Sequence, residues 1–148
     1  MIPDCYMGVA DMFYTKTVTI FNKYMNETGL GEEVWLSTVL ENVRLLVTKG
    51  ANVSTSGLSD ADTASLHIHK TNLPKPYLPP LEWQKSEHKE DYFTLSGEDD
   101  FFVEGDLSGV TPAQDDFFGK MKATYNNCFK ITNVDDYDLI AHWEVGGK

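Results

Sequence analysis

Hydrophobic and polar residues alternate over much of the chain, as they do in strands with one buried face. Residues 13–24, FYTKTVTIFNKY, alternate and are rich in β-branched and aromatic side chains, which predicts a first strand. Residues 32–48 alternate in their second half, which predicts a long strand, or two strands joined by a bend near Glu41. Residues 63–70, TASLHIHK, place apolar side chains on one face and both histidines on the other, which predicts a half-buried strand.

Turn and loop signals separate these segments from four further strands. Residues 51–62, ANVSTSGLSDAD, are small and polar and predict a loop. Residues 90–106, EDYFTLSGEDDFFVEGD, contain two short aromatic runs around SGEDD and predict a β-hairpin. Residues 128–134 predict another strand, 135–138 a turn and 141–147 a last short strand.

One helix is indicated near residue 111. Thr111 is suited to be its N-cap, with Pro112 at the first helical position and Gln114 completing a capping box. An apolar stripe follows at helical spacing, formed by Phe117, Phe118, Met121 and Tyr125.

Six or seven strands with one packed helix predict a mainly β protein, either a small β-barrel or a β-sandwich. We expect residues 1–12 to be an N-terminal extension and residues 13–148 to form a single β-rich domain with an extended proline-rich loop at 71–90.

Four of the six prolines lie in residues 73–83, LPKPYLPPLEW. This spacing favours a semi-rigid extended loop, since proline restricts the backbone. The PYLP tetrapeptide also matches the PxxP pattern that SH3-type domains bind, but so short a match arises often by chance. Because a stiff segment loses little entropy on docking, we hypothesise that it reaches a neighbouring subunit.

The net charge of −11 is unevenly distributed. Residues 1–89 contain 8 basic and 10 acidic residues, whereas residues 90–148 contain 4 and 13. With one arginine and an acidic C-terminal part, the chain is poorly suited to hold a nucleic-acid backbone, which requires clustered lysine and arginine. An acidic wall would instead suit a surface past which DNA slides without sequence-specific binding.

The two cysteines, Cys5 and Cys128, have no metal-ligand or redox spacing, so we expect unpaired thiols in a reducing compartment. The N-terminal residues lack the pattern of a signal peptide, and no apolar run is long enough to span a bilayer. We therefore expect no membrane association.

His67 and His69 are two residues apart on a predicted strand and are the weak candidates for a metal site. A third ligand would have to come from His88, His142 or a carboxylate, and two histidines on a wet strand face are more often ordinary surface residues. The acidic clusters lack the spacing of a calcium loop, and turns favour aspartate in any case. Motifs for nucleophilic catalysis and for phosphate binding are missing. The sequence therefore predicts no catalytic residue, no cofactor and no enzyme.

Several segments, taken in order, resemble a family of small phage and prophage proteins of Firmicutes. They are YTKTVTIFNKY, VWLSTVLENVRL, GLSDADTASLHI, KPYLPPLEW, YFTLSGEDDFFVEGD, KITNVDD and the C-terminal AHWEVGGK. The resemblance covers most of residues 13–148 and contains no catalytic signature. Leu36 and Ser37 replace the usual Tyr-Pro pair of the family, which affects no site residue.

This resemblance implies a virion structural protein of the phage neck, a head–tail connector of the stopper or head-completion class. Such a protein would assemble in the host bacterial cytoplasm as a ring and would contact neighbouring neck and tail proteins. A tail terminator or tail-completion protein is the alternative, and a small metal-dependent enzyme is a second one. From expected exposure alone, the interface residues would be Pro76, Tyr77, Leu78, Pro79, Trp83, Asp99 and Asp100.

Overall fold

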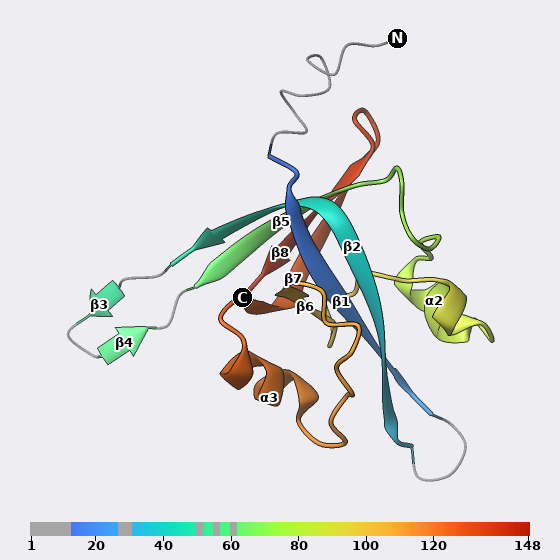
Figure 1. Cartoon of the computed structure of the whole chain (residues 1–148), viewed down its shortest axis with the longest axis horizontal. Coiled ribbons are helices and arrows are strands. Elements are labelled where there is room, and N and C mark those ends of the chain that lie inside the picture. The colour runs from blue at the N-terminus through green and yellow to red at the C-terminus, as the bar shows by residue number, and fades with distance from the viewer. Residues whose placement is uncertain (1–12, 27–30, 50–51, 55–56, 60–61) are drawn as a thin grey trace.

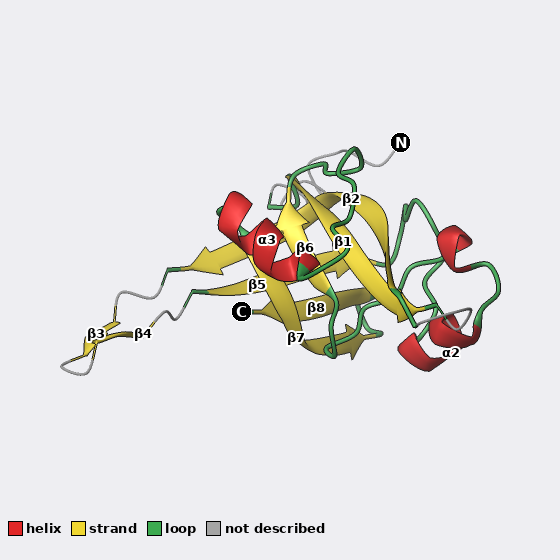
Figure 2. Ribbon diagram, turned by 90° about the horizontal axis from the view of Figure 1, so that it is seen from below, coloured by secondary structure: helices red, strands yellow, loops and turns green. Residues whose placement is uncertain are grey.

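The computed structural model shows a closed antiparallel β-barrel of six strands (Figures 1 and 2). It describes residues 13–26, 31–49, 52–54, 57–59 and 62–148. The strands follow the order β1-β2-β5-β8-β7-β6 around the barrel, and β6 closes it by pairing with β1. Of the two expected architectures, the barrel is therefore the observed one. The strands of the barrel are β1 (Lys16–Met25), β2 (Glu33–Thr48), β5 (Thr63–His69), β6 (Phe101–Glu104), β7 (Cys128–Tyr137) and β8 (His142–Gly147).

The long strand β2 pairs with two different strands along its length. Its first part pairs with β1, and from Arg44 onward it pairs with β5. The register of the β1 pair shifts beside Glu41 and Asn42, and Asn42 has a φ of 57°, as expected of a bulge. The bend predicted near Glu41 is thus confirmed within one continuous strand.

Alternating residues of all six strands fill the barrel interior. Phe93 and Leu95, which precede β6, are also fully buried in this core. Its members are Val18, Ile20, Leu40, Val43, Ala64, Leu66, Ile68, Phe93, Leu95, Phe102, Phe129, Ile131, Trp143 and Val145.

A second apolar cluster covers the outer face of β1 and β6. Helix α3 (Phe117–Thr124) packs there through Phe117 and Met121. The helix begins later than the capping box at Thr111 predicted: Asp116 is its N-cap and accepts a hydrogen bond from the Gly119 amide. The expected helix therefore exists, but the predicted N-cap was wrong, since the preceding segment lies in loop and turn conformations.

The hairpin predicted at residues 90–106 is not formed. Only its second half is a strand, β6, and both edges of β6 are occupied by β1 and β7. The first half instead makes an isolated parallel bridge between Phe93 and Tyr77. Burial of two apolar side chains in the barrel outweighs the local hairpin signal.

The proline-rich segment folds back onto its own domain. It ends in a short helix, α2 (Pro80–Lys85), with proline in its first turn and a fully buried Trp83. The Trp83 indole N–H donates to the carbonyl oxygens of Lys89 and Tyr92, which lie at 3.2 and 3.4 Å in and just after the 3-10 turn η1 (Lys89–Asp91). The prolines thus fix a segment that covers one end of the barrel, which contradicts the idea of an extended arm.

A two-stranded ribbon, β3 (Asn52–Ser54) and β4 (Gly57–Ser59), stands where a loop was expected. It lies beyond the ends of β2 and β5 and projects from the barrel (Figures 1 and 2). At the C-terminus, the strand expected at 128–134 continues through the predicted turn to Tyr137, and the turn follows at residues 138–141.

Cys128 is buried with a free thiol, whereas Cys5 and the expected extension 1–12 lie outside the described residues. Burial raises the pKa of the Cys128 thiol to about 12, partly offset by Lys122. Among the described helices, none has the length and apolar character needed to cross a membrane.

Candidate functional site

Two histidines and one glutamate meet on the outer face of β5 and β8. His67 lies directly opposite Glu144 in the antiparallel register, and His142 precedes Glu144 by two residues, so all three side chains lie on one face. One potential ligand atom from each lies within 4.8 Å of the other two. We call His67, His142 and Glu144 the His-His-Glu cluster.

The distances within the cluster are short. The His142 Nε2 atom is 3.1 Å from Glu144 Oε2, and the His67 Nε2 atom is 3.8 Å from Glu144 Oε1. The two imidazole rings are stacked, with centroids 6.2 Å apart and planes inclined by 9°. Each side chain retains partial exposure, from 15% for His67 to 33% for Glu144, so the cluster is open to small solutes.

Hydrogen bonds hold both rings in place. The Nδ1 atom of His142 contacts the carbonyl oxygen of Ile140, which can only accept, so Nδ1 carries the proton. The Ser65 hydroxyl lies 3.1 Å from His67 Nε2. Burial lowers the pKa of His67, Glu144 opposes this, and Arg44 and His142 add to it, so His67 is neutral near pH 7.

The structure places the two histidines of the predicted pair against different partners. His69 shares the outer face but turns to stack on Tyr14, with ring centroids 4.0 Å apart. His142, one of the unplaced third ligands, is the true neighbour of His67. His88 belongs to a separate exposed group with Glu90 and Asp91. In the β5–β8 register His142 lies directly opposite His69 and Glu144 opposite His67, so the His67–His142 contact runs diagonally between the strands. The sequence alone contains no signal for that register.

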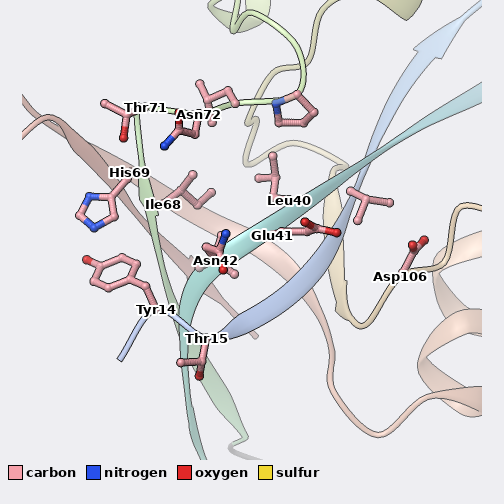
Figure 3. Close-up of a pocket in the computed structure, with 14 residues that line it drawn as sticks. Tyr14, Thr15, Leu40, Glu41, Asn42, Ile68, His69, Thr71, Asn72 and Asp106 are labelled. Carbon is pink, nitrogen blue, oxygen red and sulfur yellow. The ribbon is translucent and has the colours of Figure 1, made fainter. Parts of the chain in front are cut away.

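A cleft of about 980 Å³ opens beside the β2 bulge (Figure 3). Tyr14 and His69 lie on one side of it and the carboxylates of Glu41 and Asp106 on the other. Asn42 and Asn72, both with positive φ, line it as well. The lining is suited to hydrogen bonding with a small polar ligand.

The interface residues proposed from the sequence differ in exposure. Pro76 and Pro79 are exposed, as the hypothesis required, and Leu78 is half-buried. Tyr77 is half-buried and packs against Trp143, with ring centroids 4.6 Å apart. Trp83 is fully buried, so it is not presented to a partner.

The two aspartates proposed at the hairpin tip also differ in exposure. Asp99 is exposed and pairs with Lys23 at 3.5 Å, whereas Asp100 is buried. The Asp100 carboxylate accepts hydrogen bonds from the Asn22 side chain at 2.8 Å and from the Lys23 amide at 3.0 Å. The exposure expected of Trp83 and Asp100 was therefore wrong, because both fix loops to the barrel.

Exposed apolar residues missed by the sequence reasoning lie at the β7–β8 tip, residues 137–141. Leu139 is 100% exposed, Ile140 69% and Tyr137 44%. The tip extends beyond the barrel body (Figure 1). Neighbouring apolar side chains that remain this exposed are typical of contact surfaces.

The fold defines a small closed β-barrel that carries projecting hairpins and an open His-His-Glu cluster. By its sequence the chain belongs to a family of unknown function, DUF6751, whose family model matches residues 13–148. Comparison with curated proteins and with solved structures gave no match.

Proposed function

We propose that this protein is a phage virion component, a ring-forming head–tail connector of the stopper or head-completion class. It is assembled in the bacterial cytoplasm and contacts neck and tail proteins. The observation that carries the proposal is the combination of a closed barrel with two projections, the β3–β4 ribbon and the β7–β8 tip. The resemblance to small phage proteins supports the same class.

A ring requires one surface of each copy to contact a different surface of the next. In a closed barrel each strand is paired on both sides, so association through strand edges is largely blocked within the barrel itself. The β3–β4 ribbon has only two strands, and the outer edge of each is available for pairing with a strand of a neighbour. The ribbon is thus suited to be one half of a head-to-tail contact.

The β7–β8 tip supplies an apolar contact of a different kind. Leu139 and Ile140 are adjacent and expose most of their surface. Burying such side chains against a partner yields roughly 1.5–3 kcal/mol each. A small number of residues at a projecting tip is therefore enough to contribute substantially to a neck interface.

The acidic C-terminal part is consistent with a wall that DNA passes without sequence-specific binding. Asp135, Asp136 and Asp138 are exposed on β7 and the turn that follows. If these carboxylates face the lumen of a ring, they repel the phosphate backbone. A solubilising outer surface is the other role for the same charges.

Electron microscopy of lysates from a phage or induced prophage lacking this gene tests the proposal. DNA-emptied heads beside free tails of normal length support a stopper, because the portal channel could not be closed. Tails of aberrant length support a tail terminator instead. Complete, infectious particles would refute both assignments.

Complementation with tip variants links the phenotype to the structure. We expect a Leu139→Ser, Ile140→Ser double variant to leave folding intact and to fail in restoring particles. Leu81→Ser, at a leucine in α2 that is 76% exposed, is the matched control and should complement fully. Full complementation by the tip variant would remove the tip from the interface.

A small metal-dependent enzyme is the second candidate, favoured by the His-His-Glu cluster. A catalytic zinc centre has three protein ligands and one open position. This candidate requires an activity that is lost in His67→Ala, together with bound metal.

A further inference from the structure

We propose that His67, His142 and Glu144 bind a divalent transition metal ion of the zinc class. The proposal concerns this cluster alone and does not depend on a role in the virion. Two imidazoles and one carboxylate form a ligand set that zinc and its neighbours in the first transition row accept. Calcium and magnesium, which prefer oxygen ligands, fit it poorly.

The spacing of the ligand atoms matches a single small ion. Bonds of about 2.0–2.1 Å in a tetrahedral site place neighbouring ligand atoms about 3.3 Å apart. The Glu144 carboxylate lies 3.1 Å from one imidazole nitrogen and 3.8 Å from the other. The ligand atoms of all three residues lie within 4.8 Å of one another, so shifts of up to about 1.5 Å in these partly exposed side chains would complete the coordination.

The contacts of Glu144 direct both histidines toward its carboxylate. Because the Ile140 carbonyl accepts from His142 Nδ1, the Nε2 atom is the ring nitrogen that faces Glu144, 3.1 Å from Oε2. His67 lies opposite Glu144 in the strand register, and its Nε2 atom is 3.8 Å from Oε1. A metal ion bound here would engage one nitrogen of each ring and the carboxylate together.

The outer contacts of the cluster resemble those of metal-binding histidines. Such histidines usually donate their second ring N–H to a carbonyl or carboxylate, which fixes the ring orientation. His142 does so through Ile140, and the stacked Tyr137 ring, with its centroid 4.9 Å away, restricts it further. The site is therefore partly organised by the β7–β8 hairpin before any ion arrives.

One nearby charge opposes binding. Arg44 lies opposite His67 in the β2–β5 register and lowers the local affinity for a cation. Its guanidinium lies over the Phe13 ring, 5.3 Å from the centroid. We therefore expect a site of micromolar rather than picomolar affinity, with its fourth position filled by water or by a group from a neighbouring protein.

The test is isothermal titration of tag-free, EDTA-treated full-length protein with zinc chloride alone. We expect one saturable site per chain. His142→Ala and Glu144→Gln should each weaken binding at least tenfold, and the urea midpoint of each metal-free variant shows whether it folds. Cobalt(II) should bind the same site and give the intense visible absorption of four-coordinate cobalt.

Two histidines outside the cluster provide matched controls. His69→Ala removes a histidine from the same strand face, and His88→Ala removes one from the exposed group with Glu90 and Asp91. Both variants should bind zinc as the unmodified protein does. The proposal is overturned if zinc does not bind saturably, if Glu144→Gln binds normally, or if either control variant loses binding. Such a failure would also remove the enzyme candidate and would leave the connector proposal unaffected.

Discussion

Replacing Asp100 by asparagine should change how the stability of the protein depends on pH. Asp100 is 3% exposed, and burial raises the pKa of its carboxyl from 3.8 to about 6. Hydrogen bonds from Lys23, Asn22 and Ser96 lower this pKa, whereas the charge of Asp99 raises it slightly further. The folded protein therefore holds a proton at pH values where the unfolded chain has released it.

The sign and size follow from proton linkage. Between pH 4 and 6 the folded state binds more protons than the unfolded state, so the free energy of unfolding falls as the pH rises. A pKa of about 6 against 3.8, at 1.36 kcal/mol per pKa unit, corresponds to about 3 kcal/mol. This contribution is fully present below pH 3.8 and is lost above pH 6.

The assay is urea unfolding followed by tryptophan fluorescence at several pH values from 4 to 7. Other carboxylates also titrate in this range, so the informative quantity is the difference between Asp100→Asn and the unmodified protein. We expect that difference to move in favour of the variant by about 2.4 kcal/mol between pH 4 and 7, since part of the contribution is already lost at pH 4. Asp99→Asn, at the exposed neighbour, should show little of this effect. A difference that stays constant with pH would refute the reasoning.

Three further predictions concern stability and reactivity. Trp83→Ala should lower the free energy of unfolding by about 3–5 kcal/mol, because it empties a fully buried site. Leu81→Ala, at an exposed residue, should change it by less than about 0.5 kcal/mol. Urea unfolding measures both values, and equal effects would contradict the burial of Trp83. Gly147→Ala should cost about 1–3 kcal/mol, since its Cβ would lie 2.8 Å from two phenylalanine side chains, whereas Gly109→Ala meets nothing within 4 Å and serves as the control in thermal unfolding. With the other cysteine replaced by serine, Cys128 should react with a disulfide reagent at pH 8 only after unfolding, because burial raises its pKa to about 12; rapid modification of the folded protein would show that the thiol is accessible.

The alternation of residue types was sufficient to predict the β class and most of the barrel strands. In β5 the side chains alternate, with Leu66 and Ile68 inward and His67 outward. This alternation is a direct consequence of strand geometry and can be read from the sequence. The bend at Glu41 was predictable for the same reason, since the alternation changes phase there. The apolar stripe was sufficient to predict helix α3 but not its first residue. The capping box at Thr111 predicted an earlier start, whereas residues before Asp116 pack as a loop.

Pairing between distant segments was not predictable. Residues 90–106 look like a local hairpin, yet β6 pairs with β1 and β7 because Phe102 is buried inside the barrel and Phe101 beneath α3. The proline-rich segment looks like a free arm, yet Trp83 finds a buried site at the end of the barrel. In each case long-range burial outweighs a local preference worth about 1 kcal/mol or less.

The same distinction holds for the candidate sites. By itself the sequence determined the mainly β class, the acidic C-terminal part and the presence of two histidines on one strand face. Only the tertiary structure decided that His67 meets His142 and Glu144, that Asp100 is buried, and that Leu139 is exposed at a projecting tip. The physical reason is that periodicity fixes which side of a strand a residue occupies, whereas its neighbours depend on the strand order and register of the closed barrel.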